Sequence, residues 1–536
     1  MSYLSFPFGG SQPVASQIGW VNVKDFGALG DGVTNDRAAI AAADTAALAT
    51  GTTLIFPPGT YVVATSLAIA SPTYFLPGAS LSIGASQVVT LSYSPQAGRS
   101  RIFAGAGSVT FTAAALADAF PEWWGAKTGG TDCVAGITAA VASGMKRLLF
   151  ASGAYTVLST VTLVGYSYYE LVGMGRFATQ IIGSNLGTYC LMRIGGAAAV
   201  SQQSDVTVRN LAFIAGGVCS GTNPGFQIQY LTRPTITEVT VYNFTVGVYM
   251  LGNFDTFLDT VTAYTGNSTI ANVYGFYVDG ATQNGSVDAR RCISSHYGFT
   301  GTGASYGWYT TGADISDQFV LNSEFDLCSY GVYIDGSAAT QNAFSLDLHF
   351  TNIICDQCKV AGIVVNGLQV NAGMCEINGG WFAPSAAAAT AVNLLNSSGV
   401  IVRGMQIYSV GTTSLAGINL TGSTNCIVSQ NILKGQFTNG MALQNGSTGN
   451  IIENNQFTTT GTVAGNAAVV LVNSDHNNIS HNSIARVGAV VWASGITVAT
   501  ASDYCNVIGN IIPTAAATTR ISLGANANCY SVGTAG

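Results

Sequence analysis

Short runs in which apolar and polar residues alternate, separated by glycine and asparagine, fill most of the chain after residue 205. Strict alternation predicts half-buried β-strands whose apolar side chains point inward and whose polar side chains point outward. The recurring unit is a strand of the form apolar-x-Asn/Asp/Glu-x-x-apolar, followed by a glycine turn and a second strand. It returns at intervals of roughly 25 residues, a period typical of solenoids built from stacked coils.

Two sets of positions carry this pattern. The strand motif contains Asn210, Glu238, Asn378, Asn431, Asn454 and Asn482, and the glycine turns contain Gly247, Gly275, Gly331, Gly362 and Gly417. A β-propeller would need blades of about 40–50 residues, and a leucine-rich repeat would need regular leucine spacing. We therefore predict an all-β chain that folds as a single-stranded parallel β-helix, which the general rule for parallel crossovers makes right-handed.

The first third of the chain contains an internal repeat. Residues 20–63 return in degenerate form at 124–157, and each copy has a strand, a glycine-rich turn, an alanine-rich helix and a second strand ending in Gly-x-Tyr. A repeat of this kind indicates a modular architecture. We expect the first helix, residues 37–49, to plug the blunt end of the solenoid.

Four strings of residues carry a family resemblance. VKDFGA (23–28), GDGVTND (30–36) and FPPGTY (56–61) resemble the opening of the pectate-lyase superfamily, in particular the branch found in bacteriophage tailspikes and capsule depolymerases. PEWWGA (121–126) resembles the start of the second unit in such tailspikes. The resemblance implies a right-handed β-helix and a homotrimer. In that family these residues build the scaffold, so they indicate a fold and not a reaction.

The resemblance and the repeats predict four parts. These are a virion-docking segment at 1–19 for another phage tail component, a pectate-lyase-like capping unit at 20–120, the parallel β-helix with its catalytic face at 121–512, and a C-terminal cap at 513–536. The N-terminus has neither the basic region nor the apolar core of a signal peptide, and no stretch resembles a membrane span. We expect a protein made in the host cytoplasm that acts on the virion tail at the bacterial surface.

Composition narrows the possible partners and cofactors. Only 8% of the 536 residues are charged, and a net charge of −7 with 18 Lys and Arg lacks the basic character of a nucleic-acid binder. The 11 cysteines are scattered singly through strand-like segments, which predicts reduced, buried thiols. The pair Cys355 and Cys358 forms a lone CxxC without a second pair, which favours a coil corner over a zinc or redox site. We predict no metal and no cofactor.

Carboxylates concentrate between residues 288 and 356 in this weakly charged chain. If Phe325 points inward, Glu324 and Asp326 point outward, and the same logic turns Asp347 and His349 outward around Leu348. Matching Phe325 with Phe350 one coil later would stack His349 on Glu324. A similar alignment would put Arg291 beside Glu324. A loop at 301–312 would then offer Tyr306, Trp308 and Tyr309 nearby.

This arrangement predicts a carbohydrate-cleaving site. Neighbouring coils lie about 4.8 Å apart and alternate residues about 6.8 Å apart, so carboxyl pairs from Glu324, Asp326 and Asp347 fit the separations of retaining or inverting glycosidases. The predicted substrate-binding residues are Arg291, His349, Trp308, Tyr306 and Tyr309, and the second-choice acids are Asp255, Asp259 and Asp288. The alternative is that these groups are solvated surface residues and that Arg291 merely pairs with Glu324.

Three functions follow from the residues and the resemblance together. The first is a phage tailspike that binds and endo-hydrolyses a bacterial capsular or O-antigen polysaccharide. The second is a polysaccharide lyase that acts by β-elimination, with Arg291, His349 or a tyrosine as the base. The third is a receptor-binding spike without enzymatic activity.

Overall fold

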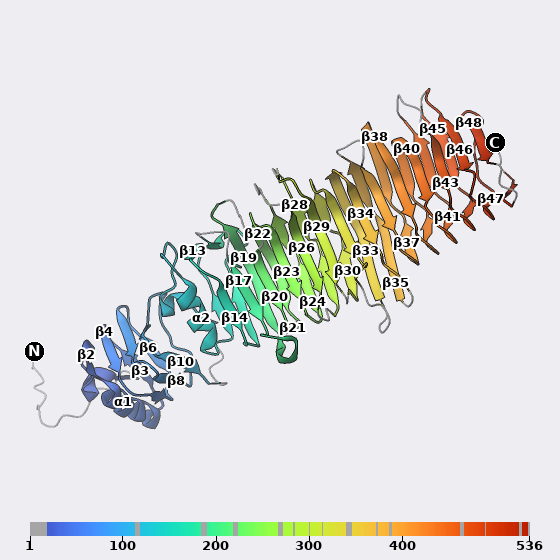
Figure 1. Ribbon diagram of the computed structural model, residues 1–536. Coiled ribbons are helices and arrows are strands. Elements are labelled where there is room, and N and C mark those ends of the chain that lie inside the picture. The colour runs from blue at the N-terminus through green and yellow to red at the C-terminus, as the bar shows by residue number, and fades with distance from the viewer. Residues whose placement is uncertain are drawn as a thin grey trace, which may run out of the picture. The chain divides into compact units, whose positions relative to one another are not determined.

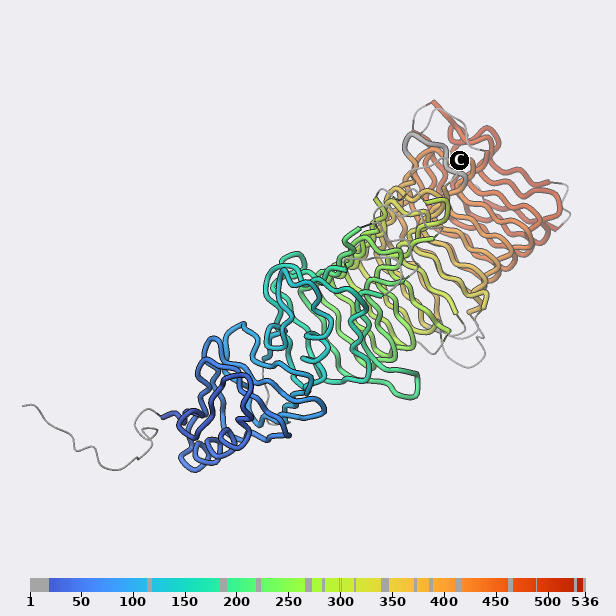
Figure 2. The backbone as a smooth tube through the Cα atoms, turned by 60° about the vertical axis from the view of Figure 1, so that its left-hand side comes forward, coloured from blue at the N-terminus to red at the C-terminus, as the bar shows by residue number. Residues whose placement is uncertain are grey.

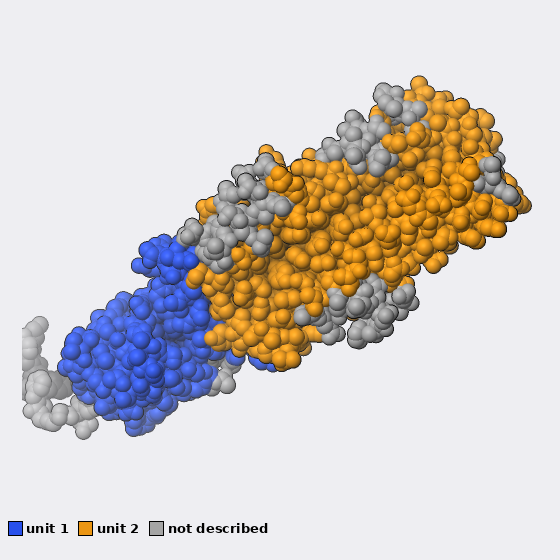
Figure 3. Space-filling model, in the orientation of Figure 1, with its two compact units in different colours: residues 1–158, 168–173 blue, residues 159–167, 174–536 orange. Residues whose placement is uncertain are grey.

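The computed structural model describes residues 19–112, 118–183, 190–217, 223–265, 272–281, 285–297, 299, 301–312, 315–338, 346–370, 373–384, 389–460, 466–487, 489–524 and 528–533. The chain divides into two compact units (Figure 3). Unit 1 comprises residues 1–158 and 168–173, and unit 2 comprises residues 159–167 and 174–536. Within the described residues, no helix is long and apolar enough to cross a membrane.

Unit 1 begins with three short parallel sheets and a helix. The sheets are β1 (Trp20–Asn22), β3 (Thr53–Phe56) and β6 (Thr73–Phe75); β2 (Asp31–Asn35), β4 (Gly59–Val63), β7 (Ala79–Ile83) and β9 (Phe103–Gly105); and β5 (Leu67–Ile69), β8 (Val88–Leu91) and β10 (Ser108–Phe111). Helix α1 (Arg37–Thr50) packs against β1, β3, β4 and β5 and buries Ile40, Ala43 and Ala47. The predicted helix is therefore confirmed, with its last turn ending at Gly51 in the left-handed conformation.

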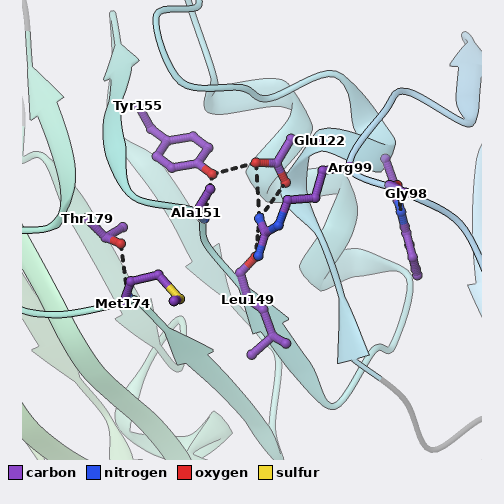
Figure 4. A network of polar contacts seen from close by, with 9 residues as sticks. Gly98, Arg99, Glu122, Leu149, Ala151, Tyr155, Met174 and Thr179 are labelled. Atoms are coloured by element: carbon purple, nitrogen blue, oxygen red, sulfur yellow. Dashed lines mark hydrogen bonds and ion pairs between the residues drawn. The ribbon is translucent and has the colours of Figure 1, made fainter.

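The second copy of the repeat contains helix α2 (Val134–Ala142), and the buried carboxylate of Glu122 lies just before this copy (Figure 4). Glu122 accepts hydrogen bonds from Arg99 Nη1 at 3.2 Å and from the Tyr155 hydroxyl at 2.7 Å, and Arg99 also donates to the carbonyl of Leu149. Burial raises the pKa of Tyr155, and the hydrogen bond to Glu122 and the negative charge of that residue raise it further. Glu122 belongs to a motif string and Tyr155 to the second repeat copy, so these residues hold the scaffold together.

Unit 2 is a solenoid in which each coil contributes strands to three parallel ladders (Figures 1 and 2). Ladder I includes β20 (Pro224–Gln229), β23 (Val246–Leu251), β26 (Val273–Gly280), β29 (Ser305–Gly312), β32 (Tyr330–Asp335) and β34 (Ala361–Asn366). Ladder II includes β24 (Thr256–Asp259), β27 (Val287–Arg290), β30 (Gln318–Leu321), the first half of β33 (Leu346–Cys358), the first half of β35 (Gly373–Pro384) and β37 (Val400–Arg403).

Ladder III is the outer surface on which the main candidate acids lie. It includes the end of β22 (Thr235–Tyr242), β25 (Thr262–Tyr264), β28 (Ile293–Ser295), β31 (Glu324–Asp326), the second halves of β33 and β35, and the beginnings of β38 (Gln406–Thr421) and β40 (Ile432–Gln444). The parallel β-helix predicted from the alternation is therefore confirmed. The described strands β48 (Ala517–Leu523) and β49 (Tyr530–Val532) extend the same stack of coils.

The corner between ladders II and III accounts for part of the strand motif. In successive coils this corner is occupied by Thr260, Arg291, Asn322 and Asn352, all with φ between 50° and 55°. This left-handed conformation favours glycine and asparagine, and later coils place Gly379, Gly404 and Asn454 there. Asn454 of the sequence motif therefore marks a corner of the coil, whereas Asn431 and Asn482 of the same motif are buried in the interior.

The glycines interpreted as turns lie inside the strands of ladder I instead. A Cβ atom at Gly275 would lie 2.0 Å from the hydroxyl oxygen of Ser294, and one at Gly247 would lie 2.8 Å from the Cβ atom of Ala263. Ser294 and Ala263 both belong to ladder III. The prediction of a repeated glycine position is confirmed, but its physical reason is the close approach of ladders I and III inside the coil.

Candidate functional site

Two carboxylates stand side by side on the outer surface of ladder III. Glu324 and Asp326 flank the fully buried Phe325 on β31, so the alternation predicted their outward direction correctly. In the preceding coil, Ser295 is the register partner of Asp326. In the following coil, Glu324 pairs with Ile354, which places Asp356 next to Asp326, and the Leu327 amide donates to the Asp356 carbonyl at 3.0 Å.

Both carboxylates of β31 hold protons more tightly than ordinary acids. Burial raises the pKa of Glu324, and the negative charges of Asp326 and Asp356 raise it further. Burial also raises the pKa of Asp326, although a hydrogen bond from the Ser295 side chain opposes the rise. Asp326 Oδ1 is shielded from solvent and has no hydrogen-bond partner in the part of the chain that the structure describes. Raised carboxyl pKa values on an outer face are a feature of acid–base sites.

The predicted stacking of His349 on Glu324 is wrong, and Asp347, which the sequence placed on the same face, does not join this pair either. Phe350 pairs with Val320 on ladder II and not with Phe325, so the coil at this point is longer than the sequence alignment assumed. His349 therefore lies over Phe319 on ladder II, with the two rings stacked at 5.2 Å, and Glu324 lies beneath Ile354 on ladder III. The sequence alone favoured Phe325 as the partner of Phe350 because both are large apolar residues at inward positions.

Asp347 and His349 belong to a separate ionic chain on ladder II. His349 Nε2 lies 2.9 Å from Asp347 Oδ1, and His349 Nδ1 lies 3.5 Å from Glu376 Oε2. Glu376 is only 6% exposed and pairs in turn with the Arg403 guanidinium of the next coil. The polar atoms of His349 are thus engaged by two carboxylates, and this network joins three successive coils.

The predicted contact between Arg291 and Glu324 is also wrong. Arg291 occupies the left-handed corner equivalent to Asn322, and its Nε donates to Asp259 Oδ1 at 2.8 Å. This hydrogen bond from the guanidinium lowers the pKa of Asp259. The other second-choice acids lie on or next to ladder II as well: Asp288 pairs with Arg290 at 2.6 Å, and Asp255 is an exposed corner residue.

The predicted aromatic loop is a strand of ladder I. Trp308 is fully buried on β29, where its Nε1 donates to Thr310 and Gln318, so the prediction of an exposed platform is wrong. Tyr306 and Tyr309 are half-buried and join a ladder of stacked tyrosines. The ring of Tyr306 lies between Tyr274 and Tyr330, at centroid distances of 5.1 and 5.2 Å. Both faces of that ring are therefore covered.

Exposed and half-buried aromatic residues instead line two hollows on ladder III, on either side of the acids. A hollow of about 240 Å³, which we call the tyrosine hollow, is lined by Tyr242, Tyr264, Thr265, Ser295 and Tyr297. A second, of about 540 Å³, which we call the tryptophan hollow, is lined by Trp381, Ala383, Pro384, Gln406 and Tyr408. The register places Ser295 one coil before Asp326, and Ala383 one coil after Asp356.

These aromatic residues were missed because their grouping depends on the coil offset. Tyr264, Ser295 and Asp326 are register partners in three successive coils, yet a whole coil of sequence separates each from the next. Trp381 and Tyr408 reach the same face through steps of different length. A single constant repeat period could not have aligned them.

The buried thiols agree with the predicted reduced cysteines. Cys355 and Cys358 are both fully buried. A hydrogen bond with Cys358, together with burial, raises the pKa of Cys355 well above its usual value. In the described residues, no group of three or more histidine, cysteine, aspartate or glutamate side chains could hold a metal ion.

Comparisons with known proteins show matches to two family models and to a solved structure of similar fold. A family model described as rhamnogalacturonase A/epimerase, pectate lyase-like, matches residues 20–256, and one described as right-handed β-helix region matches residues 308–484. A tailspike protein of Escherichia coli bacteriophage HK620 has a TM-score of 0.55 at 12% identity, over 76% of this chain and 77% of that chain. The first match covers the region of the pectate-lyase-like motif strings, and both agree with the parallel β-helix that the structure shows.

Two further similarities involve Azotobacter vinelandii proteins. The A-module of mannuronan C-5 epimerase AlgE4 is 18% identical, with 87% of this chain and 96% of that chain covered and a TM-score of 0.29. Mannuronan C5-epimerase AlgE6 is 65% identical over 43 residues, which are 8% of this chain. The match spans only 5% of the length of that curated relative.

Proposed function

We propose that this chain is a phage tailspike-type protein that binds a bacterial surface polysaccharide and cleaves it by endo-hydrolysis on the outer surface of ladder III. The observation that carries the proposal is the pair Glu324 and Asp326, whose pKa values are raised and which stand beside Asp356 between two aromatic hollows. The fold shared with the HK620 tailspike supports the type of protein. The named polysaccharide class, capsule or O-antigen, follows from the resemblance.

The proposed chemistry needs one protonated and one ionised carboxyl group. Glu324 and Asp326 form a coupled pair that retains a proton and donates it to the leaving glycosidic oxygen. Asp356 is then the ionised carboxylate that activates water or attacks the sugar. Backbone spacing of about 4.8 Å between coils and about 6.8 Å between alternate residues brings such pairs into the range of glycosidases. In this proposal Asp356 takes the place that the sequence assigned to Asp347.

Elimination is less well supported by the same geometry. A lyase needs a base beside the uronate, and the predicted candidates are Arg291, His349 or a tyrosine. His349 is bonded to Asp347 and Glu376 on ladder II, and Arg291 is paired with Asp259. Their polar atoms are therefore occupied away from the raised-pKa carboxylates.

The test separates cleavage from binding. Glu324→Gln and Asp326→Asn should each reduce depolymerisation about 10²–10⁴-fold, the usual loss for a general acid or base, and should still bind the polysaccharide. Glu453→Gln on ladder II is the matched control and should cleave normally. The measurements are halo formation on a panel of host strains and release of reducing ends. Wild-type activity in both variants would refute the assigned acids.

Two other outcomes identify the competing functions. An unsaturated product that absorbs ultraviolet light would identify a lyase. Binding to host cells without cleavage by the wild-type protein would identify a receptor-binding spike. The homotrimer and the attachment of residues 1–19 to another tail component stay predictions, and residues 1–18 lie outside the described part. Deletion of 1–19 should abolish incorporation into particles and preserve cleavage.

A further inference from the structure

We infer that the tyrosine hollow is a binding site for one uncharged pyranose unit, immediately next to the acids. The inference rests on the proposed function in one respect, because it takes the ligand to be part of the same polysaccharide. It adds a subsite, its position and its chemical class of sugar. The residues that form it are Tyr242, Tyr264, Thr265, Ser295 and Tyr297.

The ring geometry of the hollow suits a sugar. Tyr242 and Tyr264 come from adjacent coils, with ring centroids 6.2 Å apart and planes at 67°, so they form an angled wall rather than a closed stack. Tyr297 is 80% exposed and Tyr242 is 41% exposed. Tyrosine combines an apolar ring with a hydroxyl, which matches the mixed surface of a pyranose.

Thr265 provides an independent sign of a missing ligand. Thr265 lines the hollow and is 2% exposed, yet its Oγ1 has no hydrogen-bond partner among the described residues. Its backbone amide is satisfied by the Ser295 carbonyl at 3.0 Å. A buried hydroxyl without a partner is unfavourable, and a sugar hydroxyl in the hollow would supply that partner.

The charges around the hollow define the class of sugar. None of its lining residues is charged, and Ser295 hydrogen-bonds Asp326 in the next coil. A uronic acid in the hollow would bring its carboxylate close to Asp326 and Glu324 without a lining cation to compensate, which is electrostatically unfavourable. An uncharged pyranose avoids this repulsion and lies one coil from the acids.

The tyrosines of ladder I provide a contrast that strengthens the assignment. Tyr274, Tyr306 and Tyr330 stack on one another with interplanar angles of 8° and 14°, so the ring faces between them are covered by neighbouring rings. The hollow on ladder III keeps exposed ring surface instead. We therefore assign sugar stacking to Tyr264 and Tyr297 and not to the tyrosines of ladder I.

The experiment uses small probes on the full chain. Methyl glucoside, methyl galactoside, methyl mannoside and methyl rhamnoside are tested one by one by ligand-observed NMR, with glucuronate as the charged comparison. At least one neutral glycoside should bind, and glucuronate should bind at least about tenfold more weakly, given the uncompensated carboxylates. Thr265→Val and Tyr297→Ala should each weaken binding about three- to tenfold, from the lost hydrogen bond and ring contact. Tyr93→Ala in unit 1, where Tyr93 is also exposed, is the control and should bind normally.

The outcomes also separate this inference from the proposed function. No binding by any neutral glycoside, or unchanged binding by Thr265→Val and Tyr297→Ala, overturns the inference even if the protein cleaves polysaccharide. Binding that both variants weaken supports the inference, and Glu324→Gln should retain it. If that binding is found and the wild-type protein cleaves no polysaccharide, the hydrolytic proposal fails and the sugar site stands.

Discussion

The coils around residues 430–510 and those around residues 295–356 stack polar side chains by the same geometry, with opposite consequences. In the later coils Asn431, Asn455, Asn482 and Asn510 form an internal column in which each amide nitrogen donates to the next amide oxygen at 3.0 Å. In the earlier coils the stacked groups are carboxylates. Amides both donate and accept hydrogen bonds, whereas ionised carboxylates only accept them, so stacking stabilises the first column and strains the second.

The two regions of the solenoid therefore differ in role: the asparagine column stabilises the fold, and the acids are the groups that we propose to be reactive. The asparagine column satisfies buried backbone and side-chain groups in successive coils. The negative charges of Asp326 and Asp356 raise the pKa of Glu324, and Asp326 Oδ1 has no hydrogen-bond partner among the described residues. We interpret the second arrangement as the consequence of a reactive surface, because functional sites commonly lower stability.

The sharpest test of the comparison replaces two acids one at a time: Asp356, which the structure places beside the β31 pair, and Asp347, which the sequence predicted to be catalytic. Asp356→Asn should reduce depolymerisation about 10²–10⁴-fold, because it removes the ionised partner of the β31 pair. Asp347→Asn should have little effect on cleavage, since Asp347 bonds His349 on ladder II. Kinetics of reducing-end release measure both. A large loss of cleavage in Asp347→Asn and little loss in Asp356→Asn would indicate that the active site lies on ladder II.

The asparagine column predicts the largest loss of stability. Asn455→Leu removes the acceptor of the Asn431 backbone amide and the donor to the Val428 carbonyl, leaving two buried groups unsatisfied. At about 1–3 kcal/mol for each group, the free energy of unfolding should fall by at least about 2 kcal/mol. Denaturant unfolding tests this, with Asn454→Gly as the control because Asn454 is an exposed left-handed corner residue. A loss as large in the control would remove the special role of the column.

Replacing Glu324 or Asp326 with its neutral amide should produce a smaller, pH-dependent gain of stability. Because folding raises the pKa values of Glu324 and Asp326, the folded protein carries an ionisation penalty that is fully present above the folded pKa values and absent below the unfolded values of about 4. Glu324→Gln and Asp326→Asn should therefore raise the melting temperature at pH 8 and not at pH 3.5. The gain should stay below about 1 kcal/mol because both groups are partly solvated. Lower stability of both variants at pH 8 would contradict the sign.

The smallest expected effect concerns the surface ion pairs. Asp288 and Arg290 form an exposed pair on one strand. Such pairs contribute little because solvent screens them. Asp288→Asn should change neither the melting temperature nor the rate of cleavage measurably. A loss of cleavage would show that ladder II takes part in the reaction.

Particular residues show what the sequence could predict. The strings around Asp25, Gly59 and Glu122 indicated the fold because they resemble the opening motifs of the pectate-lyase superfamily. The alternation around Phe325 gave the outward direction of Glu324 and Asp326 because strand geometry repeats every two residues. These predictions depend only on local periodicity or on a specific motif.

The neighbours across coils could not be predicted in the same way. Coil length varies with the loops between ladders, and Phe350 pairs with Val320 although Phe325 is nearer in sequence. Inward apolar residues do not fix the register, because Val320 and Phe325 are equally suitable partners for Phe350. Because the register between coils was not fixed, the sequence placed Trp308 in a loop near the acids. For the same reason, Tyr264, Tyr297 and Trp381 were not included in the predicted site.

The most direct test is a crystal structure of the Asp326→Asn variant soaked with an oligosaccharide fragment of a polysaccharide that the wild-type protein degrades. The account predicts sugar density along ladder III, with rings against the tyrosine and tryptophan hollows and a glycosidic oxygen within hydrogen-bonding distance of Glu324. Density confined to ladder II near His349, or to the stacked tyrosines of ladder I, would contradict it.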